Sequence, residues 1–541
     1  MENKITSKFN VMAIILIVVF AICLAPVTLQ NDTYYTIKIG EYILENGITM
    51  QDPFSWHENL PYTFPHWAYD VATYLIYSIG GFWGIYIATA ILAAILGLAI
   101  YFTNVKITKN NLLSFIITIG ALYFMRDYIA ARAQLVTFIL FILTVFFIEK
   151  FLETKQKRYA AGLIIIPIII ANVHLAVWPF YFVLYLPYIG EYIFALVANI
   201  DITWRNRKIK KLNKKMLKEN LDEKVAELKE KISKLEEANE ESRVRKIKIK
   251  KDAYKLEVVR NDNVKWLVVI MIICLLTGLL TPLHGTPYTY LINTMKGNTT
   301  QFISEHLPLT LMDNIEFLLV ITLFIAILMF TDTKIRLSDF FMAAGLLLLA
   351  FKTRRQVSMF LLMGTLILNR LACSLFEKYD REGCRKFTKL MVTIPGKLIT
   401  SGLLLLLCFA FVHTKINDKF VNEKWYPVQA AEYIKENIDL STMKLYNEYN
   451  YGSYLLLQGI PVFIDSRADL YAPEFNGDKD IFSDFINTNN LGLYYEDKME
   501  EYGITHVIIN KNSKLYMFLS RDDKYKELYS DDNFVVYERG N

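Results

Sequence analysis

The sequence predicts a mainly α-helical protein: a multi-pass transmembrane helix bundle followed by a small C-terminal α/β domain. Three observations support this. Of the 541 residues, 54% are hydrophobic, more than one ordinary soluble domain contains. These residues gather in long apolar blocks, several of which reach the length that crosses a hydrocarbon core of about 30 Å. After residue 413 the blocks stop, and shorter segments with soluble character begin.

The apolar blocks predict about eleven membrane spans. They lie at residues 11–29, 80–103, 112–125, 135–152, 159–173, 175–199, 265–283, 314–331, 338–351, 356–376 and 390–412. If the N-terminus with Lys4 and Lys8 is cytoplasmic, every cytoplasmic connection is basic, as the orientation rule for membrane proteins requires. An odd number of spans then places the C-terminus outside. We therefore expect a multi-pass protein of the cytoplasmic membrane.

Charge and hydropathy together divide the chain into four regions. Between residues 201 and 265 there are 21 basic and 13 acidic side chains, a net charge of +8, whereas residues 414–541 carry 14 and 22, a net charge of −8. Opposite charge in two polar regions indicates that they lie on opposite sides of the membrane. The expected regions are an N-terminal transmembrane region (1–200) with an amphipathic first external loop (30–79), a cytoplasmic charged helical hairpin (201–264), a C-terminal transmembrane region (265–413) and an extracytoplasmic α/β domain (414–541).

The charged hairpin contains a short heptad-like pattern. Leu221, Val225, Leu228, Ile232 and Leu235 follow a 4-3-4-3 spacing, which is typical of a coiled-coil helix. We expect the chain to fold back near residues 238–242. A solvated hairpin is the favoured interpretation, and docking to a partner or to anionic lipid is the alternative.

The C-terminal region alternates between strand and helix patterns. KLYNEY, PVFIDS, THVIIN and NFVVYE are typical of short buried strands, and SYLLLQ, DIFSDFINTNN and LYYEDKMEEYG are typical of helices. Such alternation predicts a small α/β domain with a largely parallel sheet. Its segment FIDSRADLY contains Asp465, Arg467 and Asp469 after a predicted strand. An ion pair that holds the loop is the favoured interpretation there, with acceptor binding as the alternative.

Two carboxylates in the first external loop are candidate catalytic groups. The loop is aromatic and amphipathic, and we expect it to lie against the bilayer. Asp32 follows the first span directly, so the helix end fixes its height at the membrane surface. A carboxylate placed there can take a proton from an acceptor hydroxyl. Asp52 is the second candidate. The competing interpretation of Asp32 is that it caps the next helix.

Arginines in short external turns form the strongest signal. Arg126 and Arg132 lie in MRDYIAARAQ, and Arg354 and Arg355 lie in KTRRQ, although orientation rules deplete short external loops of such residues. The planar guanidinium matches phosphate oxygens, so converging arginines indicate a phosphate whose tail lies in lipid. The alternative is pairing with local acids such as Asp127 or Glu305.

Further polar residues fall on the same predicted side. Ionisable groups at membrane depth usually face a cavity, so the other cavity candidates are His66, His174, His284 and Glu305. For any single histidine a packing role is favoured over catalysis. Paired CxxC or HxxxH spacing is absent from the sequence, and so are a Walker loop and a glycine-rich dinucleotide motif. We expect no metal, no cofactor and no nucleic acid among the ligands.

The chain resembles the GT-C superfamily of membrane glycosyltransferases, which includes protein O-mannosyltransferases, aminoarabinose transferases and oligosaccharyltransferases. The resemblance is to bacterial, mannosyltransferase-like members. Matching features are Asp32 in NDTYYTIKIG, Asp52 in QDPFSWHENLP, and His66 in HWAYDVATYLIYSIGG before the second span. The stretch YNEYNYGSYLLLQGIPVFIDSRADLY is similar to the external domain of uncharacterised bacterial relatives.

The resemblance implies a transferase that uses a polyprenyl-phosphate-linked sugar. Such enzymes transfer the sugar outside the cytoplasm to a hydroxyl or amide of a glycan, lipid or protein acceptor. Asp32, or failing that Asp52, would be the base, and Arg126, Arg132, Arg354 and Arg355 would hold the donor phosphate. Two alternatives stay open: a transporter or flippase of lipid-linked sugars, which would need polar residues along the depth of the bundle, and a non-catalytic membrane scaffold.

Overall fold

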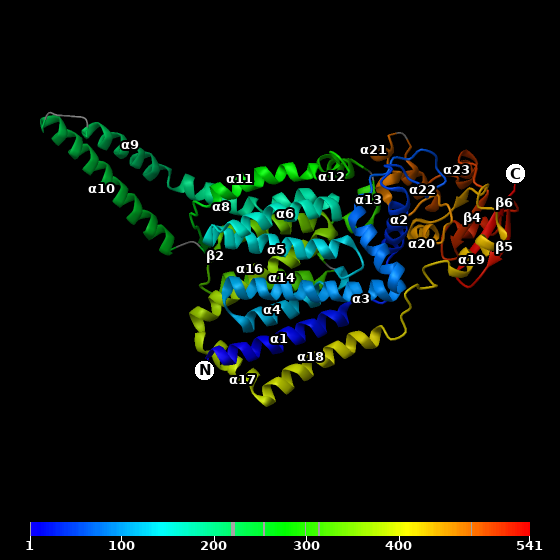
Figure 1. The fold of residues 1–541 in the computed structure, drawn as a ribbon, viewed down its shortest axis with the longest axis horizontal. Helices are drawn as coiled ribbons and strands as arrows, with labels where there is room; N and C mark the ends of the chain where they lie inside the picture. Colours follow the sequence, from blue (N-terminus) through cyan, green and yellow to red (C-terminus); the bar gives the residue numbers. More distant parts are fainter. Residues whose placement is uncertain are drawn as a thin grey trace.

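The protein is an elongated helix bundle with a different appendage at each end. The computed structural model describes residues 2–217, 222–252, 255–297, 299–311, 314–477 and 479–540. A charged hairpin projects from one end of the bundle, and a C-terminal domain covers the other (Figure 1). We call these the hairpin end and the domain end. The N-terminus lies at the hairpin end, and the basic hairpin and the acidic domain are at opposite ends of the bundle.

The bundle is built from α1 and α3 to α18, without the hairpin helices. Its main helices are α1 (Glu2–Leu24), α3 (Trp67–Thr108), α4 (Asn111–Phe124), α5 (Ala133–Thr154), α6 (Lys157–Val173), α7 (Trp178–Val183), α8 (Leu186–Ala198), α11 (Val264–Cys274), α12 (Thr286–Lys296), α14 (Ile315–Phe330), α15 (Leu337–Lys352), α16 (Val357–Tyr379), α17 (Arg381–Val392) and α18 (Ile394–Thr414). Short helical turns connect several of them, including η1 (Arg126–Tyr128), η4 (Ser304–His306) and η6 (Arg354–Gln356).

Six helical segments of the described chain are long and apolar enough to cross a membrane, which makes this a membrane protein. They are Ile5–Leu24, Trp67–Thr108, Ala133–Thr154, Leu175–Ala198, Arg354–Tyr379 and Ile394–Thr414. The predicted count of about eleven is not confirmed. Several expected spans form shorter helices: α4 has 14 residues, α14 and α15 have 16 each, and α6 has 17. At a rise of 1.5 Å per residue these reach only about 21–26 Å.

The second span begins earlier than its hydropathy indicated. α3 starts at Trp67, not near residue 80, and the helix is interrupted at Gly81, which has a φ of 55°. This left-handed backbone conformation is one that glycine adopts without a steric penalty. The first external loop therefore ends at His66, and the residues from Trp67 to Gly80 extend the bundle toward the domain end.

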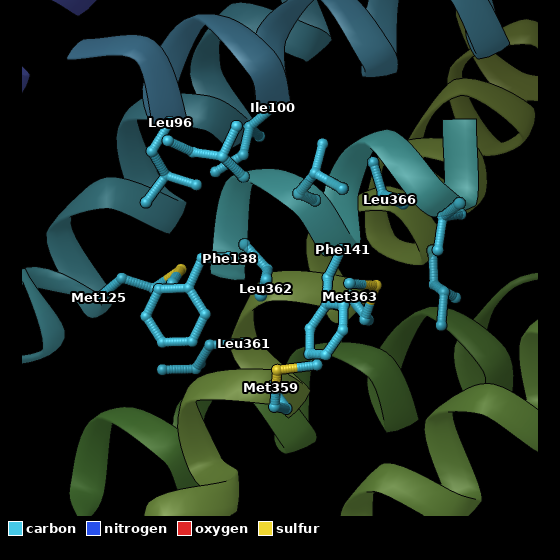
Figure 2. Close-up of a cluster of buried hydrophobic side chains, with 14 of the residues drawn as sticks. Leu96, Ile100, Met125, Phe138, Phe141, Met359, Leu361, Leu362, Met363 and Leu366 are labelled. Carbon is cyan, nitrogen blue, oxygen red and sulfur yellow. The ribbon is translucent and has the colours of Figure 1, made fainter. Parts of the chain in front are cut away.

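Close packing of large side chains holds the bundle together. Figure 2 shows buried residues of α3, α5, α16 and the turn after α4 pointing toward one another: Leu96, Ile100, Met125, Phe138, Phe141, Met359, Leu361, Leu362, Met363 and Leu366. Helices distant in sequence are thus fixed side by side. The turns that carry the predicted arginines, after α4 and before α16, share this core and cannot move independently.

The hairpin forms, but it folds back at a different place from the one predicted. α9 (Ile200–Met216) and α10 (Asp222–Asp252) pack against each other, and α10 includes residues 238–242. Arg205 of α9 donates hydrogen bonds to the carbonyl oxygen of Ala238 at 2.7 Å and to the Ser242 hydroxyl at 2.8 Å. The predicted turn at 238–242 was wrong, because these residues are helical, belong to α10 and face α9. Leu221 lies outside the described residues.

The C-terminal domain is an α/β domain with a mixed sheet. The strands β3 (Leu445–Tyr446), β4 (His506–Asn510), β5 (Tyr525–Ser530) and β6 (Phe534–Arg539) take the order β3-β4-β6-β5. Only β3 and β4 are parallel, and the other two pairs are antiparallel, so the predicted largely parallel sheet was wrong. PVFIDS is not a strand of this sheet. The surrounding helices are α19 (Val428–Asn437), α20 (Tyr449–Leu457), α21 (Pro473–Asn476), α22 (Ile481–Asn489), α23 (Tyr495–Glu501) and α24 (Tyr516–Leu519).

The first external loop belongs to the core of the C-terminal domain. α2 (Asn31–Asn46) packs against α3 on one side and α20 on the other. Its fully buried Tyr34 makes edge-to-face contacts with Tyr426 and Tyr454, with ring centroids 4.9 and 5.4 Å apart. Helix α2 was expected to lie against the bilayer, but protein covers both of its sides. The apolar side chains of α2 therefore pack against the domain and not against lipid.

A glycine makes the close approach of α2 to α3 possible. A Cβ added at Gly40 would lie 2.1 Å from the backbone oxygen of Asp70. We expect Gly40→Ala to lower the free energy of unfolding by about 1–3 kcal/mol, because the two backbones must separate. The matched control is Gly120→Ala in α4, where an added Cβ meets nothing within 4 Å. Alanine should be neutral or stabilising there. Thermal unfolding in detergent compares the two, and equal midpoints would contradict the tight α2–α3 contact.

Candidate functional site

A polar cavity of about 200 Å³ opens at the domain end of the bundle. It lies where η1, η4 and η6 meet the residue that precedes α2. Three turns far apart in sequence therefore converge, as the arginine pattern predicted. The lining residues are Gln30, Asp127, Tyr128, Ala130, Arg132, Gln134, Ser304, Glu305, Arg354 and Arg355.

Asp32, Arg132 and Glu305 form a chain of charges beside this cavity. A guanidinium nitrogen of Arg132 lies 2.9 Å from an Asp32 carboxylate oxygen, and a second lies 3.1 Å from a Glu305 oxygen. The three side chains are between about a quarter and a half exposed. Burial would raise the pKa of Glu305, but Arg132 and Arg355 hold it below its usual range. The Glu305 carboxylate is therefore ionised at neutral pH.

Asp32 is not a helix cap. The N-cap position of α2 is occupied by Gln30, and no side chain accepts a capping hydrogen bond there. Asp32 lies in the first turn, where the helix dipole favours a negative charge, and its carboxylate faces Arg132. Asn31 binds the C-terminal domain instead, donating a hydrogen bond to the carbonyl oxygen of Tyr449 at 3.0 Å. The amide next to Asp32 thus fixes the start of α2 to α20.

The predicted phosphate-binding arginines separate into two groups. Arg126 is held by Glu316 through two hydrogen bonds of 3.0 and 2.9 Å, and it does not line the cavity. Arg354 and Arg355 do line the cavity, and within the described part of the chain neither makes an ion pair. Arg354 donates only to the carbonyl oxygen of Pro308, at 3.3 Å. These two cations are free to bind an anion.

The histidine candidates lie in two separate places. The rings of His66 and His174 lie 5.2 Å apart, and His174 shares a hydrogen bond of 2.9 Å with the Thr137 hydroxyl. Burial, followed by the charges of Arg355 and Arg132, lowers the pKa of His66 to about 3, so its imidazole is neutral. This pair lies behind the cavity and not in its lining. His284 is exposed, with a φ of 56°, and does not join the cluster.

Asp52 has a different environment from Asp32. It is fully buried, and its carboxylate lies 2.6 Å from Arg467 of the C-terminal domain. Arg467 also binds Asp465 at 2.7 Å, and its guanidinium lies over the ring of Tyr62, 4.8 Å from the centroid. The Asp465–Arg467 pair therefore holds its loop, which was the favoured interpretation. It also joins the first external loop to the domain, which the sequence did not indicate.

The C-terminal domain reaches the bundle through Asp469 as well. Its carboxylate accepts hydrogen bonds from Tyr290 at 2.8 Å and Thr294 at 3.3 Å, both on α12. Burial raises the pKa of Asp469, although these hydrogen bonds and the charge of Arg355 oppose the rise. Tyr290 and Gln30 are residues that sequence reasoning missed. Only the position of Gln30, two residues before Asp32, could have indicated a role.

Within the described residues, no group of three or more His, Cys, Asp or Glu side chains is arranged to hold a metal ion. The donors present at the cavity are instead three guanidinium groups, two amides and two hydroxyls, and they lie with the carboxylates of Asp127 and Glu305. Such a set recognises an anion with several oxygens better than it recognises a cation. The cavity is therefore a candidate phosphate-binding site.

Known proteins resemble this chain in fold but not in sequence. No protein-family model and no curated protein matches the sequence. Among solved structures, the fold matches the crystal structure of the Archaeoglobus fulgidus oligosaccharyltransferase in the apo form, with a TM-score of 0.54 and 12% sequence identity. The match covers 99% of this chain and 74% of that chain.

The chain has a GT-C-like fold. The match runs through both the helix bundle and the C-terminal domain, because it covers nearly the whole chain. At this low identity the likeness concerns the fold alone. The closer resemblance to bacterial mannosyltransferases stays a prediction. In this GT-C-like fold, the cavity and Asp32 lie where the bundle meets the C-terminal domain.

The buried contact between Asp52 and Arg467 should control both stability and acid sensitivity. Burial alone would raise the pKa of Asp52, but Arg467 and hydrogen bonds from Ser55 hold it below its usual range. Replacing Asp52 with Asn should cost about 3–5 kcal/mol, because a buried guanidinium loses a partner. Because the folded-state pKa lies below the unfolded one, this contribution is present above about pH 4 and is lost as the pH falls further.

Unfolding experiments between pH 7 and pH 3 measure the difference in the free energy of unfolding between wild type and Asp52→Asn. It should stay constant near neutrality and shrink in acid. Asp523→Asn, at an exposed position of the same domain, is the matched control and should change little. A wild-type advantage that persists unchanged at pH 3 would contradict the assignment of the pair.

Proposed function

We propose that this protein is a membrane glycosyltransferase that moves a sugar from a polyprenyl-phosphate donor to an extracytoplasmic glycan, lipid or protein acceptor. The observation that carries the proposal is the pair of cations, Arg354 and Arg355, without an ion-pair partner in the described structure, in a cavity that is also lined by Arg132, the ion-pair partner of Asp32. The GT-C-like fold agrees with this activity, although a fold alone does not establish one.

The two arginines suit the leaving group of such a reaction. When an acceptor displaces the sugar, the bond between the anomeric carbon and the phosphate oxygen breaks, and negative charge grows on the phosphate. Donors fixed at that position stabilise the transition state more than the ground state. Arg355 also influences the electrostatics of Glu305, His66 and Asp469, which agrees with a position central to the site.

Asp32 is the proposed general base, and Arg132 is its positioning partner. The carboxylate takes a proton from an acceptor hydroxyl, and the acceptor oxygen then attacks the anomeric carbon. The ion pair with Arg132 fixes the direction of the Asp32 carboxylate. With about a quarter of its side chain exposed, Asp32 is accessible to an acceptor. Buried Asp52, bound to Arg467, is not, so the proposal assigns Asp52 to holding the loop.

Charge supports placing this site outside the cytoplasm. The basic hairpin and the N-terminus lie at the opposite end of the bundle from the C-terminal domain (Figure 1), and positive charge favours the cytoplasmic side. The C-terminal domain, with its net charge of −8, covers the cavity end. The proposed enzyme therefore receives donor and acceptor at the outer surface of the cytoplasmic membrane.

Arg355→Gln tests the leaving-group role. We expect a fall in transfer rate of about 10²-fold or more, because one donor to the growing charge is lost. Radiolabelled polyprenyl-phosphate hexose with membrane extract as the acceptor source measures transfer by purified full-length protein. Lys352→Gln is the control, since this exposed lysine is three residues away and does not line the cavity. Equal rates for the two variants would contradict the assignment.

Asp32→Asn tests the base in the same assay. Loss of general base catalysis should lower the rate constant for transfer by about 10²–10⁴-fold, while donor binding stays within a few-fold of wild type. Product analysis separates the proposal from a flippase, because a flippase leaves the sugar–phosphate bond intact. Unchanged transfer at normal protein levels would remove Asp32 from this role.

A further inference from the structure

A second and larger cavity, of about 390 Å³, lies at the hairpin end of the bundle. It is formed where α3 and α5 end, where α15 begins, and along α8 and α16. Its lining is dominated by charged side chains: Lys106, Lys109, Glu149, Lys150, Glu153, Glu191, Arg336 and Arg370, together with Tyr188, Asn261 and Ser338. Nothing in the proposed transfer reaction uses this cavity.

The buried charges of this cavity neutralise one another. Glu149 lies 2.6 Å from Arg336 and 2.9 Å from Arg370. Asp339 binds the same two arginines, at 3.0 and 2.9 Å. Tyr188 donates a further hydrogen bond of 2.9 Å to Glu149. Two arginines and two carboxylates thus form a closed network that fixes α5, α8, α15 and α16 and contributes no net charge.

The remaining acids of the lining are occupied too. Glu153 binds Lys150 at 2.6 Å, and Glu191 accepts a hydrogen bond of 2.9 Å from the backbone of Val259. Lys106 and Lys109 are exposed at the mouth, and neither has an ion-pair partner in the described ranges. The cavity therefore presents two lysine charges at its mouth without an ion-pair partner in the described residues, above a closed ion-pair network and the Glu191 carboxylate, whose hydrogen-bond partner is a backbone amide.

Two donors inside the cavity wall also lack partners. The hydroxyl of Ser338, a residue only 2% exposed, makes no hydrogen bond in the described structure, and the same holds for the Nε–H of Arg370. A buried polar group without a partner costs roughly 1–3 kcal/mol. An acceptor that enters the cavity would give these two donors hydrogen bonds that the protein does not supply within the described residues.

We propose that this cavity binds a phosphate ester group, with Lys106 and Lys109 attracting the anion and the Ser338 hydroxyl donating to it. The volume lies in the range of ordinary ligand sites. Basic pockets between helices at a membrane surface suit lipid headgroups, and a soluble phosphate ester offers the same oxygens. The inference does not depend on the proposed transferase activity, because the site lies at the other end of the bundle.

Binding to purified full-length protein tests the proposal. The probes are mixed micelles of neutral detergent with phosphatidylglycerol, micelles with phosphatidylcholine, and soluble glycerol phosphate. The readout is the rise in the thermal unfolding midpoint with probe concentration, which gives an apparent dissociation constant. Phosphatidylglycerol should stabilise more than phosphatidylcholine. A response to glycerol phosphate at similar concentration would identify a soluble ligand, and no response to either phosphate monoester or anionic lipid overturns the proposal.

Two variants locate the binding. Lys106→Gln with Lys109→Gln should weaken the anionic probe about tenfold or more, since each surface lysine contributes about fivefold. Lys389→Gln with Lys397→Gln, two exposed lysines near the same end, is the matched control and should bind as wild type does. Equal weakening in both pairs would overturn the proposal, because it would show attraction to the general surface charge alone.

Ser338→Ala separates binding from a structural role. The hydroxyl has no partner in the ligand-free structure, so its removal should leave the unfolding midpoint without probe unchanged or raise it. The shift caused by the anionic probe should nevertheless shrink, with binding weakened several-fold. A variant that loses stability without probe but binds as tightly as wild type would contradict the proposed contact.

Discussion

The buried contact of Arg467 with Asp52 and Asp465 determines where the candidate site lies. It joins the first external loop to the C-terminal domain in a region closed to solvent, where an unmatched charge is strongly unfavourable. Because Asp52 cannot leave its partner, the loop that follows α2 is fixed to the domain. α2 is in turn fixed between α3 and α20, and the height of Asp32 above the bundle follows from that position.

Both ends of the bundle contain arginines that are at least partly buried, but their charges are balanced in different ways. At the hairpin end, Glu149 and Asp339 neutralise both buried arginines. At the domain end, Arg126 and Arg132 have carboxylate partners, whereas Arg354 and Arg355 have none among the residues that the structure describes. Cations left without partners in a partly enclosed site hold their positions only because the surrounding helices are packed. The shared core of α3, α5 and α16 supplies that rigidity, so the site can attract an anion without collapsing onto a local acid.

Several features could be predicted from the sequence because they rest on local chemistry. The arginines of the short external turns indicated a common cavity, and Arg132, Arg354 and Arg355 do line one. Arg126 does not line the cavity, because its guanidinium is hydrogen-bonded to Glu316, 190 residues away along the chain. Hydropathy could not give the number of spans, because a block such as 338–351 is equally apolar whether its helix crosses the membrane fully or in part.

The sequence by itself determined the helical membrane character, the opposite placement of the basic hairpin and the acidic domain, and the residue types that gather at the domain end. Each follows from composition or from the chemistry of neighbouring residues. Only the tertiary structure decided that Asp32 faces Arg132, that Asp52 binds Arg467, and that the sheet is mixed. These outcomes depend on contacts that only folding brings together: 100 positions separate Asp32 from Arg132, and 415 separate Asp52 from Arg467. A charged side chain has many potential partners in the sequence, and packing brings only one or two of them within reach.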